Sequence, residues 1–369
     1  MTTPISLYNP YISGNAKKYV NECLDSTWIS SKGKFIVLFE QSFCDYTKTK
    51  SATCCSNGTV AIHLALMALG IKAGDEVIVP TFTYIASVNT IVMANAKPVF
   101  IDSLADTLQL DPAKIEAKIT KKTKAIIVPH LYGFAADMDA IMTIAKKYNL
   151  YVIEDCAEAL GTFYKGKHVG NFGDIATFSF FGNKTITTGE GGMVASNNEA
   201  LIKKCLHIKG QGLESLNPEK NSAREYWHDI IGYNYRMTNI QAAIGLSQME
   251  IIEEILEKKT FVTETYKQYL DSDKIKILAS TNDVTSSYWM IVLMFDNAET
   301  VNKVRAVLRT NHIETRPLFP PVHTMDMYKN AEHFEVAEDI SLKGINVPSY
   351  PELTSDQIKY ICNIINQNI

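Results

Sequence analysis

The alternation of strand-like and helix-like segments in the first two hundred residues constrains the fold most strongly. From about residue 50 to residue 200, short runs rich in β-branched residues alternate with longer segments of helical pattern, as in βαβ units around a mainly parallel sheet. Most of these runs are apolar throughout, which is typical of strands covered on both faces. The predicted strands span residues 76–80, 98–102, 125–129, 151–155, 175–181 and 192–196. We therefore predict an α/β fold.

The rest of the chain indicates a second, smaller unit. A helical segment at 240–259 leads away from the sheet, and the residues after it mix helical and β-like runs, as an α+β domain does. We expect a large domain at 1–250 and a small C-terminal α+β domain at 251–369. A polar, turn-rich stretch at 213–224 is predicted to be a functional loop. Other predicted helices span 59–69, a segment opened by Asp111-Pro112, 137–148, 298–310 and 355–366, and further β-like runs span 288–295 and 313–317.

Composition excludes several classes of function. The net charge is −4, from 36 Lys and Arg against 40 Asp and Glu, so no basic surplus is present for a nucleic-acid partner. No apolar run approaches the roughly 20 residues of a membrane span, and the first residues have no signal pattern, so we expect a cytoplasmic protein without a membrane partner. The cysteines and histidines lack metal-ligand spacing, and no metal is expected.

Three local motifs carry residues suited to chemistry, and each also has an ordinary structural explanation. The run at 56–59, with Gly58 and Thr59, precedes a helix whose free amides suit a phosphate, although a simple N-cap is the alternative. Asp155 ends a strand at the edge where α/β folds bind ligands, or it caps the next helix. Lys184 leaves a buried strand, where a free amine can form a Schiff base, or it is a surface lysine.

The three motifs together predict pyridoxal 5′-phosphate (PLP) as the cofactor. PLP needs a lysine, a phosphate anchor and an acidic partner for its pyridine nitrogen, and this chain offers them in that combination. Tyr84 follows the strand at 76–80 and is expected to place its flat face against the ring, with core or interface packing as the alternative. The first βα turn lacks the glycine fingerprint of dinucleotide sites, which argues against a nicotinamide dehydrogenase.

At these motifs the sequence resembles the PLP-dependent nucleotide-sugar aminotransferases, which have the aspartate-aminotransferase fold, fold type I. The resemblance covers essentially the whole chain and implies a seven-stranded, mainly parallel sheet in the large domain. Within that family the similarity is greatest to the GDP-perosamine synthases, which transfer an amino group from glutamate to GDP-4-keto-6-deoxymannose. The motifs that carry the resemblance lie at 28–33, 56–59, 80–84, 130–133, 154–158, 178–184, 232–239, 314–317 and His323.

The resemblance implies roles for the residues around the cofactor. Lys184 would form the Schiff base and shuttle a proton, and Asp155 would pair with the pyridine nitrogen. Ser179 would hold the phosphate together with the Gly58-Thr59 turn. Glu158 would lie beside the ring oxygen, at a position where many relatives carry glutamine.

Residues further from the ring also receive roles from the resemblance. Asn234 would bind the phosphate from the partner subunit, so that a homodimer forms the active site. The candidates for binding the nucleotide-sugar are Trp28, Ser30, Lys32, Arg316 and His323. An arginine is well suited to a pyrophosphate, although an interface ion pair is the alternative for Arg316.

The expected activity is transfer of the amino group of L-glutamate to C4 of a nucleotide-linked 4-keto-6-deoxy sugar, with the cofactor alternating between PLP and its amine form, PMP. GDP-4-keto-6-deoxymannose is the expected acceptor and GDP-perosamine the product. Related dehydratases carry histidine where this chain has Lys184, which favours transamination. The same reaction on a UDP-linked 2-acetamido-4-keto sugar of the bacillosamine pathway, or on a dTDP-4-keto sugar, stays open, as does a non-catalytic PLP-binding regulator. The family expectation is synthesis of polysaccharide precursors, such as those of lipopolysaccharide O-antigen.

Overall fold

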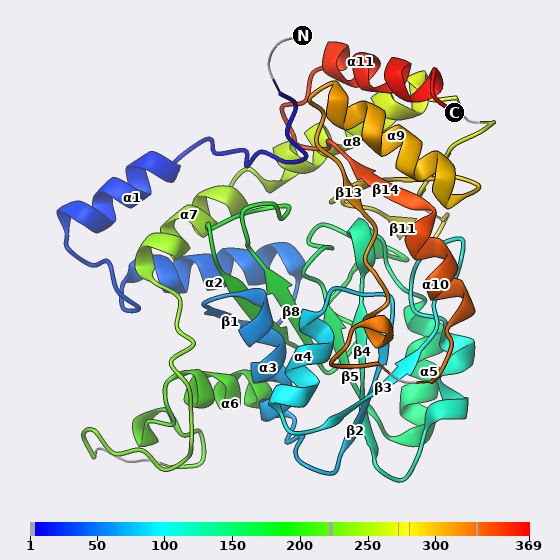
Figure 1. The fold of residues 1–369 in the computed structure, drawn as a ribbon. Coiled ribbons are helices and arrows are strands. Elements are labelled where there is room, and N and C mark those ends of the chain that lie inside the picture. Colours follow the sequence, from blue (N-terminus) through cyan, green and yellow to red (C-terminus); the bar gives the residue numbers. More distant parts are fainter. Residues whose placement is uncertain (1–3, 221–223, 272, 280, 330) are drawn as a thin grey trace.

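A seven-stranded sheet lies at the centre of the computed structural model, which describes residues 4–220, 224–271, 273–279, 281–329 and 331–369 (Figure 1). The strand order is β1-β9-β8-β5-β4-β2-β3. Strands β3, β2, β4, β5 and β8 are parallel, whereas β9 pairs antiparallel with both β8 and β1. The predicted α/β class with a mainly parallel seven-stranded sheet is confirmed. The strands are β1 Ser51–Cys55, β2 Glu76–Pro80, β3 Lys97–Ile101, β4 Thr123–Pro129, β5 Tyr151–Asp155, β8 Ile175–Ser179 and β9 Gly192–Ser196.

Helices cover both faces of this sheet because its strands are apolar on both sides. Val77 and Val79 of β2 pack in one hydrophobic cluster, whereas Ile78 between them packs in another, as the alternation of side chains along a strand requires. The first cluster contains side chains of α3 (Gly58–Ala68), α4 (Ala86–Met93) and α6 (Glu199–Lys209). The second contains side chains of α2 (Lys34–Thr47), α5 (Met138–Tyr148) and α7 (Asn239–Met249).

Two of the predicted helices differ in the structure. Asp111 caps the amide of Ala113 as expected, but a cap and a proline start a turn without extending it, and only two 3₁₀ turns follow, at Pro112–Lys114 and Glu116–Lys118. The predicted helix there is wrong. The segment predicted at 240–259 is two helices, α7 and α8 (Ile252–Tyr269), with a break where Asn15 and Tyr19 donate hydrogen bonds to Glu250.

The C-terminal part forms a smaller sheet covered by helices. Its strand order is β10-β12-β14-β13, and α8, α9 (Ala298–Thr310) and α11 (Ser355–Asn366) enclose a third hydrophobic cluster with it. The β-like runs predicted at 288–295 and 313–317 are shorter strands in the structure. The remaining elements are α1 Ala16–Asp25, α10 Glu335–Leu342, β10 Lys276–Ile277, β12 Ile291–Met294, β13 Arg316–Pro317, β14 Gly344–Val347, and a small sheet of β11 Val284–Thr285, β6 Phe163–Tyr164 and β7 Lys167–His168.

Segments cross between the two units in both directions, so the division at residue 250 stays a prediction. The amide of Ile5 donates to the carbonyl of His312, which attaches the N-terminal segment to the small unit. In return, Asp102 at the end of β3 accepts the amides of Val336 and Ala337 and so caps α10. The loop predicted at 213–224 contains a 3₁₀ turn, Glu214–Leu216, and its residues 221–223 lie outside the described residues. No helix of the described chain is long and apolar enough to cross a membrane.

Candidate active site

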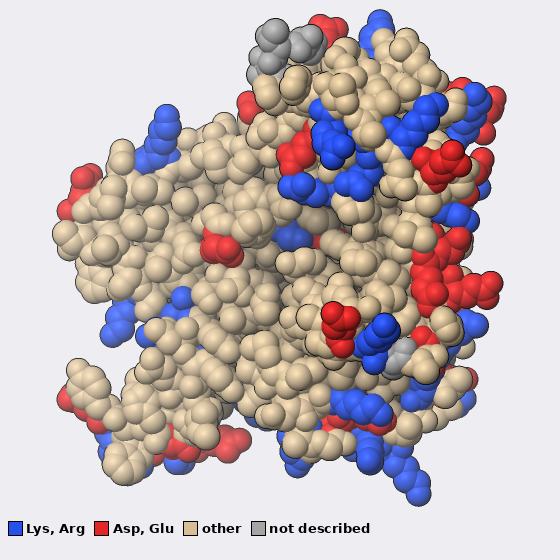
Figure 2. Space-filling view, viewed as in Figure 1, with Lys and Arg blue, Asp and Glu red and all other residues tan. Residues whose placement is uncertain are grey.

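A cavity of about 510 Å³ lies at the carboxyl ends of the parallel strands, where open α/β sheets bind ligands. Figure 2 shows a hollow on this face, between the small unit at the top and the large domain below. Residues from the ends of β4, β5 and β8, the N-terminus of α3 and the loop before β12 line the cavity. They include Gly58, Thr59, Thr83, Tyr84, His130, Asp155, Glu158, Ser179, Asn183, Lys184, Trp289 and Phe319.

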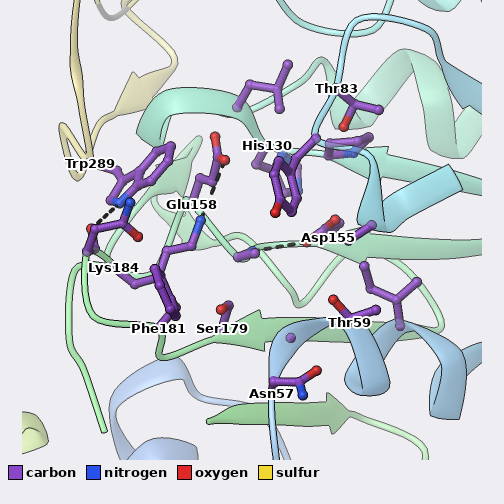
Figure 3. Close-up of a pocket in the computed structure, with 18 of the residues that line it drawn as sticks. Asn57, Thr59, Thr83, His130, Asp155, Glu158, Ser179, Phe181, Lys184 and Trp289 are labelled. Atoms are coloured by element: carbon purple, nitrogen blue, oxygen red, sulfur yellow. Dashed lines mark hydrogen bonds and ion pairs between the residues drawn. The ribbon is translucent and has the colours of Figure 1, made fainter. Parts of the chain in front are cut away.

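One end of the cavity is built from the N-terminus of α3. Asn57 is the N-cap, and its side chain accepts the amide of Val60 at 3.0 Å. The first amides of a helix have no acceptor within it, so those of Gly58 and Thr59 are available to a ligand. The backbone approaches its neighbour closely here, since a Cβ on Gly58 would lie 2.7 Å from Cβ of Ser179. Helix amides beside the Ser179 hydroxyl form a suitable site for a phosphate (Figure 3).

Asp155 ends β5 and is held in one orientation at the floor of the cavity. Its Oδ2 accepts a hydrogen bond from the Ser87 hydroxyl at 2.7 Å, and its Oδ1 accepts the amide of Ala157 at 3.1 Å. The side chain is buried, with 8% of the residue exposed. Hydrogen bonds to both oxygens fix the orientation of a carboxylate that would face the pyridine nitrogen of the cofactor.

Lys184 and Glu158 form a buried pair across the cavity (Figure 3). Lys184 Nζ lies 3.6 Å from Oε1 of Glu158, and only 14% and 6% of the two side chains are exposed. Burial lowers the pKa of Lys184, although Glu158 and Asp155 act against this shift. Burial raises the pKa of Glu158 to about 7, against the attraction of Lys184 and a hydrogen bond from the Tyr132 amide. Burial therefore brings the pKa values of the two groups closer together than they are in water.

Trp289 lies against Lys184 and was not identified from the sequence. Lys184 Nζ lies 3.9 Å from the centroid of the indole ring, and the indole Nε1–H donates to the carbonyl of Asn183 at 2.6 Å. The Tyr8 hydroxyl donates to the carbonyl of Lys184 at 2.9 Å. Both residues come from segments more than one hundred positions away, so no local motif could have indicated them.

A second buried pair, between His130 and Glu154, lies next to Asp155 in the fold. His130 Nε2 donates to Glu154 at 3.1 Å, and its Nδ1 accepts the amide of Ala136, which fixes the imidazole tautomer. The carboxylate also accepts the amides of Gly170, Phe172 and Gly173, each at 2.7 Å. Burial alone would raise the pKa of Glu154, but these hydrogen bonds hold it below the usual range. Together with Cys156 these side chains have ligand atoms within 4.8 Å of one another, but both oxygens of Glu154 are already engaged.

The predicted residues fall into two groups in the structure. Gly58, Thr59, Tyr84, Asp155, Glu158, Ser179 and Lys184 all line the one cavity. The other six do not line it within this single chain. Asn234, Trp28, Ser30, Lys32 and Arg316 are exposed, whereas His323 is buried.

The contacts of Arg316 and His323 show why neither side chain lines the cavity. Arg316 pairs with Glu314 at 2.6 Å and keeps 63% of its side chain exposed. Nδ1 of His323 forms a hydrogen bond of 2.7 Å with the Thr81 hydroxyl, and Nε2 forms one of 3.1 Å with the Glu338 carboxylate. Both ring nitrogens are therefore engaged within the protein. A substrate contact by His323 would require one of these partners to leave.

The residues that line the cavity fit PLP. It offers helix amides for a phosphate, an oriented carboxylate and a buried amine, and two buried oxygens within it, Oγ1 of Thr83 and Oδ1 of Asn183, have no hydrogen-bond partner. An unpartnered buried polar atom indicates a missing ligand group or water. A fold with these groups at the strand ends defines a PLP-dependent enzyme of fold type I.

Comparison with known proteins identifies the family within that class. The model of the DegT/DnrJ/EryC1/StrS aminotransferase family matches residues 10–366, and the chain belongs to this family of PLP-dependent aminotransferases. It is 54% identical to a GDP-perosamine synthase of Escherichia coli O157:H7 and 47% identical to one of Vibrio cholerae, each over 98% of both chains. It also resembles a sugar aminotransferase of Streptococcus pneumoniae solved in its PLP form, with a TM-score of 0.92 and 28% identity over 99% of this chain and 98% of that one.

Proposed function

We propose that this chain is a sugar-nucleotide 4-aminotransferase that converts GDP-4-keto-6-deoxymannose to GDP-perosamine. The observation that carries the proposal is the 54% identity to a GDP-perosamine synthase over 98% of both chains. In the overall reaction the amino group leaves L-glutamate, which becomes 2-oxoglutarate, and replaces the keto oxygen at C4 of the sugar. The reaction balances because C4 of the sugar gains the amino group and a hydrogen and is reduced, the α carbon of glutamate loses both and is oxidised, and the keto oxygen passes to that carbon through water.

The cavity residues would hold the cofactor from three directions. The amides of Gly58 and Thr59 and the Ser179 hydroxyl would bind its phosphate, and Asp155 would pair with its pyridine nitrogen. Tyr84 lines the cavity with 57% of its surface exposed; its ring lies 5.8 Å from that of Phe319, and its exposed part would lie against the cofactor ring. When bound, PLP supplies an electron sink for the negative charge that develops on the substrate carbon.

Lys184 and Glu158 would then handle the protons. With a pKa lowered by burial, Nζ of Lys184 can take a proton from the substrate carbon and return it to the neighbouring position. Glu158, 3.6 Å away with a pKa of about 7, can hold a proton at Oε1 without a large change in free energy. Trp289 covers the amine and excludes water from that side of the cavity.

A homodimer would complete the site. Between α6 and α7 the chain extends away from the body, at the lower left of Figure 1, and it carries the exposed apolar side chains of Tyr226, Trp227 and Ile231. Such side chains are typical of an interface. Asn234 lies on the same extension, and we propose that it binds the phosphate in the partner subunit's cavity.

The nucleotide would lie at the mouth of the cavity. Lys and Arg side chains gather above the hollow, over β13 and α9 (Figure 2), and a guanidinium such as that of Arg316 suits a pyrophosphate. Trp28, Ser30 and Lys32 are exposed and would contribute across the dimer interface. We propose the cytoplasm as the place of action.

Mass spectrometry of the reaction products tests the proposal. The PLP-loaded protein is mixed with L-glutamate and a pool of GDP-, UDP- and dTDP-linked 4-keto sugars. We expect an amino sugar on GDP alone. Amination of a UDP-linked 2-acetamido-4-keto sugar or a dTDP-linked sugar would instead assign one of those substrates, and PLP that glutamate leaves unchanged would indicate a regulator without turnover. Light scattering during size-exclusion chromatography tests the dimer, and a monomer would refute it.

A further inference from the structure

A lysine outside the cavity is buried behind the active-site lysine. Lys259, on α8, is 1% exposed. Burial lowers its pKa to about 7, and no charged group of the described chain offsets this effect. A buried lysine without a carboxylate partner is unfavourable, because desolvation of the ammonium is not repaid by an ion pair. An apolar side chain of similar length would avoid this desolvation.

The contacts of Lys259 match the three donors of an ammonium group. Nζ donates to the carbonyl of Trp289 at 2.9 Å and to the carbonyl of Ser349. The ring of Tyr8 faces it as well, with the centroid 5.3 Å from Nζ, which is within cation–π distance. A neutral amine keeps two N–H groups, so both carbonyl contacts persist in either protonation state.

Two of these partners hold the backbone of the active-site lysine. The Tyr8 hydroxyl donates to the carbonyl of Lys184, and the indole of Trp289 donates to the carbonyl of Asn183. The third partner fixes the Tyr8 segment, since the amide of Ser349 donates to the carbonyl of Leu7 at 3.1 Å. Lys259 therefore touches both residues that clamp the peptide units on either side of the Lys184 Cα.

We infer that Lys259 is a positioning residue for Lys184, acting through Trp289 and Tyr8. The inference rests on the proposed role of Lys184. Because Nζ of Lys184 must meet both the cofactor and Glu158, its backbone has to stay in place. Lys259 connects α8 of the small unit to that backbone through one buried group. This function explains why a lysine occupies a site where an apolar residue would be less costly.

The test compares Lys259→Met with Val262→Ala. Methionine keeps the length of the side chain and removes the donors. Val262 lies three residues further along α8 in the hydrophobic cluster of the small unit, so its truncation perturbs the same helix without removing a donor from this network. Both variants are first compared by thermal unfolding, so that any loss of global stability is known.

The first readout uses the cofactor-free protein and does not depend on activity. Hydrogen exchange is measured for peptides that cover residues 181–188, where the amide of Lys184 donates to the carbonyl of Phe181. We expect exchange in this segment to be about tenfold faster in Lys259→Met and unchanged in Val262→Ala. Only Lys259→Met weakens the hold of Tyr8 and Trp289 on the backbone of Lys184.

The second readout is the reaction of the PLP-loaded enzyme with glutamate alone. We expect the rate at saturation to fall about ten- to a hundredfold in Lys259→Met, as for a misplaced catalytic group, with the half-saturating glutamate concentration almost unchanged. If the wild-type enzyme does not react with glutamate, the proposed function fails, whereas the exchange comparison still tests the positioning role.

Two results would overturn the inference. The first is that Lys259→Met shows the same hydrogen exchange at 181–188 and the same rate with glutamate as the wild type. The second is that Val262→Ala accelerates this exchange and slows this reaction as much as Lys259→Met does. If Lys259→Met does not fold, Tyr8→Phe decides, because it removes only the hydroxyl that donates to Lys184. In that variant we expect a several-fold slower reaction with glutamate and faster exchange at 181–188. No change in either quantity would refute the inference that Tyr8 helps to position Lys184.

Discussion

Replacing Glu158 by glutamine should lower the pKa of Lys184 in the cofactor-free enzyme. The carboxylate lies 3.6 Å from Nζ and its negative charge favours the ammonium form, so its removal favours the neutral amine. At this separation two unit charges attract by about 1 kcal/mol at the dielectric constant of water and about 5 kcal/mol at an effective value near 20. At about 1.4 kcal/mol per pKa unit, we expect the pKa of Lys184 to fall by roughly one to three units.

Competitive acetylation measures this shift directly. The labelling rate of the Lys184 peptide is followed by mass spectrometry against pH, because only the neutral amine reacts. The labelling midpoint should move to lower pH in Glu158→Gln. Glu190→Gln serves as the control, since Glu190 lines the same cavity but has no part in the pKa shift of Lys184. A midpoint that stays in place or rises in Glu158→Gln would refute the electrostatic pairing.

Three further predictions follow from the same geometry. Lys184→Ala should abolish turnover and leave the circular dichroism spectrum unchanged; measurable steady-state activity would contradict its role. Gly58→Ala should weaken PLP binding about tenfold or more, because the added methyl would lie 2.7 Å from Ser179, whereas Gly182→Ala, whose methyl meets nothing within 4 Å, should bind PLP normally in a fluorescence titration. Asp102→Ala should lower the free energy of unfolding by about 1 to 2 kcal/mol in urea, since α10 loses its cap; no change would show that water replaces the carboxylate.

Most strands of the large sheet were predictable because a strand that is buried on both faces is a short run of apolar residues. The bounds expected for β2, β5 and β9 match the structure, since strands covered on both faces have few polar residues. β1 was missed: its sequence, Ser-Ala-Thr-Cys-Cys, has small side chains and becomes a strand by pairing with β9. The helix expected after Asp111 failed because a cap and a proline start a turn but cannot extend it.

The residues of the cavity differ likewise in how far they could be predicted from local sequence. Asp155 ends β5, Gly58 begins α3, and Lys184 lies in the turn after β8, so the chain itself places them at one edge of the sheet. Trp289 and Tyr8 reach Lys184 from separations of more than one hundred residues. Contacts of that range depend on how the small unit packs, and no spacing within a motif encodes them.

Glu154 and Glu158 show most sharply what a motif leaves open. They lie four residues apart in Glu-Asp-Cys-Ala-Glu, and both are buried, yet the pKa of Glu154 is lowered and that of Glu158 is raised to about 7. The difference lies in the donors: Glu154 accepts hydrogen bonds from His130 and three amides, whereas Glu158 accepts one amide and faces Lys184. Burial disfavours both ionised carboxylates, and their neighbours decide the outcome: the donors around Glu154 outweigh its burial, whereas the amide and Lys184 do not outweigh the burial of Glu158, whose pKa Asp155 raises further.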